Sequence, residues 1–376
     1  MLTSLALTLL SALPSAWTAD SGAPLGAVEW FRGRYSSARN RAEAQGKWTI
    51  VAFWMDGSPW SRRLIDDTFG DAAVADRLDG LMCLNVDLTR RADGTLLDQR
   101  AKEYTTRFPV AILPSIFLVS PDGRLEDVLT GYIPPQPFLA EIDRIQGHDR
   151  TLTGFERAVD SSPEDIAGRL SLAQKYEDLG DLAARDIQLT KVKELDPAEV
   201  SLPVRRRNLS IVRESMTSLF NDDEGIYDTT PLEEFLDEEE HPELLVEGWS
   251  YLADLYPRVD RAEDGRMALQ FLWRHIAEPD RMNRGSDIAR ILWEQREDLA
   301  KGDRKFALEV ASKVAALARK TVEEPTRLAE YLDPLACCYY MNGKRAAAIK
   351  TIEICIDLAP DEPSYAVRRE IFKLRK

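Results

Sequence analysis

The sequence predicts a chain of two parts: an α/β domain with a mixed sheet and helices on both faces, then an all-α region of helical repeats. Three observations support this division. Residues 27–147 alternate helix and strand patterns, the strand pattern ends before Thr151, and two stretches of the second part share one residue spacing. With about 100–200 residues per domain, 376 residues suffice for two or three domains.

The elements of the first part follow from local patterns. A helix is expected over 28–44, and the β-branched and aromatic run 48–54 is typical of a buried strand. Ser58-Pro59 then opens a helix, because Ser is a favoured N-cap and Pro is tolerated in the first turn. The later elements are a strand over 81–87, a helix over 96–108, strands over 115–120 and 125–130 joined by a turn, and a helix over 138–145. This order predicts the mixed sheet.

The second part contains paired helical patterns in which one spacing occurs twice. The marker residues of the two stretches are Leu172-Ala173, Tyr176, Gly180 and Pro197 in the first, and Leu335-Ala336, Tyr339, Gly343 and Pro360 in the second. In both stretches Leu and Gly are eight residues apart, and Gly and Pro are seventeen apart. Such a repeated spacing indicates stacked helical units, each of which completes the core of its neighbour.

The charge and composition exclude several classes of function. A net charge of −15 argues against nucleic acid as a partner, because phosphate binding needs a basic surface. Eleven acidic residues, without Lys or Arg, lie from Asp222 to Glu243. Within this run, Asn221–Gly225 lacks the oxygen ligands of a calcium loop, so a solvated acidic linker or helix face is expected, or else a docking surface for a basic partner. With three His and four Cys in the chain, we expect neither a metal nor a cofactor.

The N-terminus has the pattern of a secretory signal. Leu2–Leu13 is uncharged and mostly apolar, and small residues follow at Ala16 and Ala19. Twelve such residues are too few to span a bilayer, and no later apolar run approaches 18 residues. We therefore expect residues 1–19 to be a signal peptide, and the mature protein to be periplasmic or secreted without stable membrane insertion. A frayed or membrane-associated N-terminus is the alternative.

Residues 25–150 resemble the thioredoxin-like fold. The resemblance rests on a strand ending at Phe53-Trp54, a following helix that bears Ser61, a strand ending at Asp87, and Leu113-Pro114 just before another strand. It implies a cis Leu113-Pro114 bond beside the family's redox site. Residues 151–376 resemble tetratricopeptide repeats, with a large-small pair, an aromatic residue, a turn Gly and a closing Pro. Diverged helix pairs are expected over 244–276 and 288–322.

Both cysteines of the family's Cys-x-x-Cys motif are absent, since the motif falls on Ser58-Pro59-Trp60-Ser61. Disulfide exchange needs an attacking thiolate and a resolving thiol, and Ser supplies neither. We expect Ser58 to be an N-cap, Ser61 to lie in the same exposed first turn, and the chain to have no catalytic residue. A Ser nucleophile would need a base. The His residues, His148, His241 and His275, are all distant in sequence.

Other residues carry a functional and a structural alternative. Trp60, Leu113 and Pro114 are candidate peptide-binding residues, although Trp60 packing against Leu113-Pro114 is equally consistent with the sequence. For three further groups we expect mainly structural roles. Buried packing or a disulfide is expected for Cys337, Cys338 and Cys355. Repeat packing is expected for Tyr176, Tyr339 and Tyr340, and a solvated helix face for Arg205–Arg207.

Three functions remain open on the sequence alone. The first is an extracytoplasmic adaptor that binds proteins or peptides through a redox-inactive thioredoxin-like domain and a repeat array. The alternative is a thiol-disulfide oxidoreductase, or a redox-linked chaperone, that uses a non-standard site. The third is a structural component in which both parts serve only as scaffold.

Overall fold

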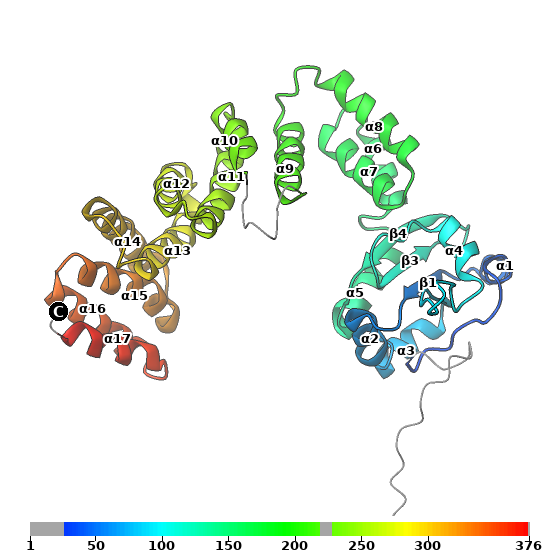
Figure 1. Cartoon of the computed structure of the whole chain (residues 1–376), viewed down its shortest axis with the longest axis horizontal. Coiled ribbons are helices and arrows are strands. Elements are labelled where there is room, and N and C mark those ends of the chain that lie inside the picture. The colour runs from blue at the N-terminus through cyan, green and yellow to red at the C-terminus, as the bar shows by residue number, and fades with distance from the viewer. Residues whose placement is uncertain (1–25, 219–227, 375–376) are drawn as a thin grey trace, which may run out of the picture. The chain divides into compact units, whose positions relative to one another are not determined.

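The computed structural model describes residues 26–218 and 228–374, so the expected signal peptide and the segment Asn221–Gly225 lie outside the described residues. The chain divides into two compact units, residues 1–200 and 201–376. The first unit contains a four-stranded sheet with its helices. The described part of the second unit is built from helices (Figure 1).

The sheet is mixed and has the strand order β2-β1-β3-β4. β1 (Thr49–Trp54) runs parallel to β2 (Met82–Asp87) and antiparallel to β3 (Ser115–Val119). β3 in turn pairs antiparallel with β4 (Leu125–Thr130). The mixed sheet predicted from the order of the elements is therefore confirmed.

Helices cover both faces of this sheet, as expected. Alternate β1 residues point to opposite sides, so Ile50 and Ala52 join one apolar cluster, whereas Val51 and Phe53 join another. The first cluster includes side chains of the π-helical turn Leu64–Thr68, which continues α2 (Pro59–Arg63), and of α3 (Ala72–Asp79) and α5 (Pro135–Gln146). The second cluster packs under α1 (Tyr35–Gln45) and α4 (Ala101–Arg107).

Three elements of this unit differ from the sequence-based expectation. The helix expected over 96–108 begins at Ala101, because Leu96 forms a β-bridge with Arg90 instead. The first helix begins at Tyr35 rather than Val28, because residues 27–33 follow the sheet instead: the Phe31 N–H donates to the Cys83 carbonyl at 2.7 Å. The helix α3 was not expected. Asp71 starts it as an N-cap, accepting from the backbone N–H groups of Ala73 and Val74.

The first unit also includes α6 (Leu152–Ser161), α7 (Ile166–Asp178) and α8 (Leu182–Leu195). Helix α6 packs on the edge strand β4. Two buried carboxylates of β4 join the layers. Glu126 accepts from the Thr153 N–H at 2.9 Å, and Asp127 pairs with Lys175 of α7 at 2.6 Å and with Arg144 of α5 at 2.7 Å. These contacts cover an edge that would otherwise be open to pairing.

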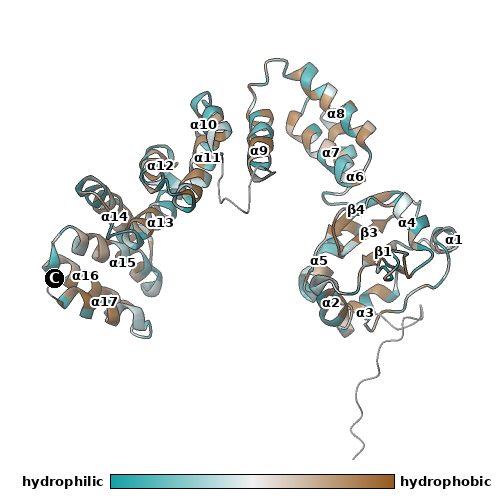
Figure 2. Cartoon of the chain, viewed as in Figure 1, coloured by the Kyte–Doolittle hydropathy of each residue, from teal (hydrophilic) through white to brown (hydrophobic). Residues whose placement is uncertain are grey.

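The second unit is a succession of helices around one continuous apolar cluster. Its helices are α9 (Leu202–Ser218), α10 (Thr230–Asp237), α11 (Pro242–Leu255), α12 (Ala262–His275), α13 (Arg281–Glu294), α14 (Lys301–Thr321), α15 (Pro325–Met341), α16 (Arg345–Leu358) and α17 (Pro363–Lys373). Hydrophobic and hydrophilic stretches alternate along these ribbons, as expected of amphipathic helices (Figure 2). In the described part of the chain, every helix is too short or too polar to cross a membrane.

The repeated spacing corresponds to two helical hairpins of matching geometry. α7 packs on α8, and α15 packs on α16. Both turns contain a glycine in the left-handed region, Gly180 with φ 78° and Gly343 with φ 72°. In both turns, the backbone N–H of the residue after the glycine donates to the carbonyl of the marker tyrosine. Asp181 donates to Tyr176 at 2.8 Å, and Lys344 donates to Tyr339 at 2.9 Å. The expected helix pairs around 244–276 and 288–322 are present as α11–α12 and α13–α14.

Candidate functional site

The Ser58–Ser61 segment lies where β1 ends and α2 begins. Ser58 is the N-cap of α2, with its hydroxyl oxygen accepting from the Ser61 backbone N–H at 3.3 Å. Pro59 follows in the first helical position, where its missing N–H costs no helical hydrogen bond. The predicted capping role of Ser58 is therefore confirmed.

Ser61 does not lie in an exposed turn, and this expectation was wrong. Its side chain is fully buried, because the first turn of α2 brings this position back against the end of β1. There the Ser61 hydroxyl oxygen accepts from the Met55 backbone N–H at 3.4 Å. Both serine oxygens thus accept backbone hydrogen bonds.

The described histidines are not arranged to activate either serine. His148 packs its ring near Trp48, with centroids 5.6 Å apart. Trp48 directly precedes β1, whereas Ser58 lies beyond the other end of that strand. His241 and His275 belong to the second unit. A Ser nucleophile with a neighbouring imidazole base therefore has no geometric support within the first unit.

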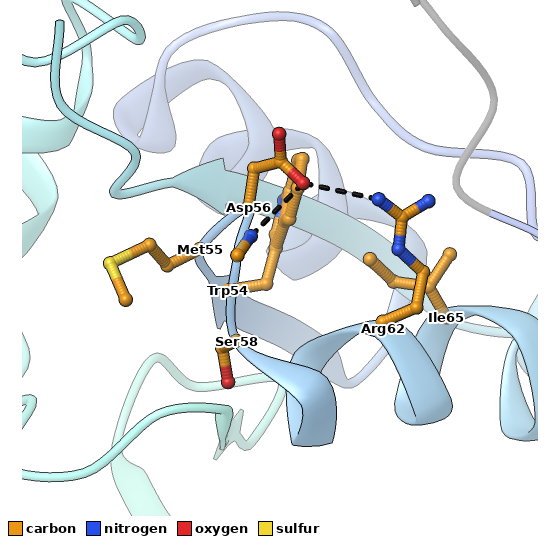
Figure 3. A pocket seen from close by; sticks show the side chains of 7 residues that line it. Trp54, Met55, Asp56, Ser58, Arg62 and Ile65 are labelled. Atoms are coloured by element: carbon orange, nitrogen blue, oxygen red, sulfur yellow. Dashed lines mark hydrogen bonds and ion pairs between the residues drawn. The ribbon is translucent and has the colours of Figure 1, made fainter.

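A small cleft opens on one side of the Ser58 loop, between Trp54 and Ile65. In Figure 3, Asp56 and Arg62 point toward one another across it, and Met55 extends away. The Asp56 and Arg62 side chains form an ion pair of 3.1 Å. The cleft has an interior volume of about 10 Å³, which is room for about one water, so the cleft is too small to be a substrate pocket.

Polar contacts also link the ends of β1 and β2 at this edge. The Asp56 backbone N–H donates to the Thr89 hydroxyl at 2.7 Å, and the Thr89 N–H donates to the Asp87 carboxylate at 2.8 Å. Burial raises the pKa of Asp87 above its ordinary value, while the hydrogen bonds from Thr89 lower it. These bonds hold the loop that carries Ser58 against the neighbouring strand end.

The Leu113-Pro114 peptide bond is cis, as the resemblance implied. Phe53 pairs with Ser115, which places this bond beside the end of β1 and therefore at the same edge as Ser58. Pro114 is buried, and its carbonyl accepts from the Gly131 N–H at 2.8 Å. Leu113 is half-buried, so it can contribute only part of a contact surface.

Trp60 is exposed and belongs to a cluster that the sequence did not indicate. Its side chain is 55 % exposed, and its ring stacks with Tyr132 at a centroid distance of 6.4 Å. The Arg63 guanidinium lies 4.2 Å from the centre of the Tyr132 ring, and the Tyr132 hydroxyl donates to Asp67 at 3.0 Å. We call Trp60, Arg63, Asp67 and Tyr132 the aromatic surface.

The aromatic surface joins parts of the chain that are far apart in sequence. Trp60 and Arg63 are three residues apart, so they share one side of the helix. Tyr132 lies two residues after β4, and only the strand order brings it to the helix. The three-residue spacing of Trp60 and Arg63 is the local signal that could have indicated their contact. Nothing in the sequence pointed to Tyr132.

All four cysteines are free and buried. Burial raises the pKa of Cys83, Cys338 and Cys355 to about 12 in each case, and it raises the pKa of Cys337 well above its ordinary value. The expectation of buried packing is confirmed, and the alternative of a disulfide among Cys337, Cys338 and Cys355 is not realised in this structure. A thiol of this kind stays protonated at neutral pH.

The other candidates in the helices are structural. Tyr340 stacks on Phe372 with ring centroids 4.8 Å apart, which confirms packing. The basic run 205–207 is partly neutralised, because Arg205 pairs with Glu239 at 2.9 Å and Arg206 with Glu243 at 2.8 Å. Within the described ranges, His, Cys, Asp and Glu nowhere gather in a group that could hold a metal ion.

A match to a protein family supports the fold of the first unit. Residues 35–146 match the family described as a thioredoxin-like domain. Solved structures similar to this chain include the DsbH oxidoreductase (13 % identity, TM-score 0.29, covering 35 % of this chain and 94 % of that one). They also include a thioredoxin from Thermus thermophilus (21 % identity, TM-score 0.27, covering 33 % and 90 %). No curated protein sequence matches the chain significantly. The first unit therefore contains a thioredoxin-like α/β domain.

Proposed function

We propose that this protein is an extracytoplasmic adaptor that binds proteins or peptides without thiol-disulfide exchange. The observation that carries the proposal is the state of the Ser58–Ser61 segment. Where the thioredoxin-like fold has its reactive thiols, this chain has a capping hydroxyl on Ser58 and a buried hydroxyl on Ser61.

The chemistry of these groups supports a role in binding only. A redox cysteine works because a helix N-terminus lowers its pKa and exposes a thiolate. Ser58 stands at such a helix N-terminus, but a hydroxyl has no comparable anion near neutral pH and forms no disulfide. The cysteines that the chain does contain are buried, and burial raises the pKa of each thiol, which disfavours the thiolate.

The aromatic surface is the first proposed contact site. Trp is enriched among residues that dominate binding energy, and an exposed Trp held by stacking loses little freedom when a partner binds. Trp60 is such a residue, with Tyr132 and Arg63 beside it. Leu113 and Pro114 lie at the same edge of the sheet and complete the proposed peptide-binding set.

The two helical hairpins, one in each unit, are further proposed contact sites. We propose that α7–α8 and α15–α16 are tetratricopeptide-like repeats, supported by their shared spacing, left-handed glycine and turn hydrogen bond. Arrays of such units present extended surfaces on which peptides bind. Export through residues 1–19 is part of the same proposal. Its test is N-terminal sequencing of extracytoplasmic protein, which should begin at Trp17 or between Asp20 and Gly26.

The alternative function keeps redox chemistry. It draws on the match to the thioredoxin-like family, and it requires one of the four cysteines, or a partner's thiol, to replace the missing pair. A thiol-disulfide oxidoreductase or a redox-linked chaperone that used a thiol of this chain would have to expose a buried cysteine during each cycle.

A site-specific crosslink tests the proposed binding role. A photoreactive phenylalanine analogue at position 60 should capture a polypeptide partner, and the adduct should persist under reducing and thiol-blocking conditions. Trp60→Ala should weaken binding of the captured partner by at least about 10-fold. The matched control is the same analogue at Trp48, which lies at the opposite end of β1. Absence of any adduct from position 60 would remove the aromatic surface from the proposal.

A further inference from the structure

A larger cavity lies among α6, α7 and α8 in the first unit. Its volume of about 370 Å³ is within the range of ligand sites, about 300–1,000 Å³. Three apolar residues, Val159, Pro163 and Leu172, line part of it. The remaining lining residues are polar: Glu156, Asp160, Arg169, Tyr176 and Gln188. The aromatic surface has no part in this cavity.

The matching hairpin of the second unit has different residues at two of these positions. The shared spacing aligns Arg169 with Leu332 and Gln188 with Thr351. Leu332 and Thr351 are only 1 % and 6 % exposed, so the second hairpin buries these positions in packed structure. Arg169 and Gln188, which replace Leu332 and Thr351, are therefore specific to the first hairpin and are not required by the hairpin geometry.

Arg169 and Gln188 are held in place by each other. The Arg169 Nε donates to the Pro163 carbonyl at 2.7 Å, and its Nη1 donates to the Gln188 Oε1 at 2.8 Å. Because the Gln188 oxygen is occupied by Arg169, its amide nitrogen is the end that can donate to a ligand. This wall of the cavity therefore offers N–H donors in a fixed arrangement.

The opposite wall, on α6, carries carboxylates. Glu156 is already engaged, since it pairs with Arg124 at 2.7 Å and accepts from the Tyr176 hydroxyl at 2.8 Å. Asp160 lies one turn further along α6 and is exposed, and the described contacts give it no ion pair. The adjoining turn adds Glu164 and Asp165 without a basic residue from 160 to 165. This wall is thus complementary to a positive charge, whereas the Arg169 guanidinium, which also lines the cavity, is complementary to an acceptor such as a carbonyl.

We propose that this cavity binds an extended peptide segment in which an apolar side chain adjoins a basic one. The inference rests on the proposed polypeptide-binding function and names the class of segment bound. The apolar side chain packs on the exposed Pro163, next to the nearly buried Val159 and Leu172, and the basic one pairs with Asp160. A main-chain carbonyl accepts from Gln188. An extended peptide suits such a site because its carbonyls and side chains point in alternate directions.

The test uses the full chain and a defined probe, the acetylated and amidated tetrapeptide Ala-Leu-Lys-Ala. Methyl NMR of Val159 and Leu172 should report its binding. Arg169→Leu with Gln188→Thr installs the residues of the second hairpin, and it should weaken binding by at least about 10-fold while the thermal midpoint stays the same or rises. Arg157→Leu is the matched control, because Arg157 is exposed on α6 and does not line the cavity. It should bind as the wild type does.

The charge is tested separately. Replacing Lys by Glu in the probe should weaken binding by about 10-fold, and Asp160→Asn should reduce that difference to about 2-fold. Asp160 is exposed, so this variant stays informative if the double variant does not fold. Unchanged binding by the double variant, or methyl shifts away from Val159 and Leu172, would overturn the proposal. So would tighter binding of free leucine or lysine than of the capped peptide.

Failure of this inference is distinguishable from failure of the proposed function. The crosslink from position 60 is measured on the same variants. If the tetrapeptide does not bind but the crosslink forms, the cavity proposal is wrong and the adaptor function stands. If neither is observed, the adaptor function itself fails.

Discussion

Ser58 and Ser61 are three residues apart, yet the fold gives them different surroundings. Ser58 is half-exposed and caps α2, while Ser61 is fully buried at the end of β1. The capping role could be predicted because it depends only on local sequence preference. The burial of Ser61 could not, because it depends on which side of a short helix faces the sheet.

Replacing Ser58 by Ala should destabilise the first unit by about 1 kcal/mol, because the Ser61 N–H loses its acceptor. Urea denaturation followed by tryptophan fluorescence measures this. Ser37→Ala provides the control, since Ser37 is exposed within α1 and caps no helix. Equal stability of the Ser58 and Ser37 variants would show that the cap contributes nothing.

The buried cysteines make a prediction about pH. Burial raises the pKa of Cys83 to about 12 from 9.0, so the folded state holds a proton that the unfolded state releases between these values. This contribution to stability is fully present below pH 9 and declines above it. A thiol reagent at pH 8 should label fewer than one cysteine per native chain and all four after unfolding. Rapid labelling of the native protein would show an exposed thiol.

At the scale of elements, the two hairpin glycines provide a matched pair. Both have positive φ, so Ala at either position costs about 1 kcal/mol of backbone strain. A Cβ on Gly180 would also lie 2.9 Å from a carbon of Pro109, whereas one on Gly343 would meet open space. Gly180→Ala should therefore destabilise its unit more than Gly343→Ala does. Chemical denaturation of both variants measures the difference, and equal losses would contradict the packing of Gly180 on Pro109.

The contacts of β4 with its covering helices can be tested at Asp127. Its side chain is buried and pairs with Arg144 and Lys175, so Asp127→Ala leaves two cations without this partner. We expect a loss of about 3 kcal/mol or more in the unfolding free energy of the first unit. Asp186→Ala, which removes an exposed ion pair with Arg185, should cost less than about 1 kcal/mol. A small loss for both would mean that Asp127 does not join α7 to the sheet.

Most elements could be predicted from the sequence because their signals are local. Strands rich in β-branched residues, the Ser58-Pro59 helix start and the repeated glycine spacing all appear in the structure. The misplaced start of α1 and the unexpected α3 have physical causes. Residues 27–33 form no helix, and the Phe31 N–H donates a hydrogen bond to Cys83 of β2 instead. Asp71 starts a new helix, α3, directly after Gly70.

At the scale of the whole molecule, the contacts of the chain divide it between residues 200 and 201, so α6–α8 belong to the first unit. The sequence marks only the end of the strand pattern near Thr151. Glu126 and Asp127 would be expected to face solvent in a strand, and only the fold shows that they bind α6 and α7. Tyr132 was missed for the same reason, because its contact with Trp60 depends on tertiary structure.

We propose that the thioredoxin-like domain acts without thiol-disulfide exchange. The most direct measurement is reduction of insulin disulfides with dithiothreitol as the electron source. The wild-type chain, and a variant with all four cysteines changed to Ala, should both show the uncatalysed rate. Ser58→Cys with Ser61→Cys serves as the control that the assay can detect a restored pair. Catalysis by the wild type that disappears when one cysteine is removed would contradict the claim and establish the redox alternative.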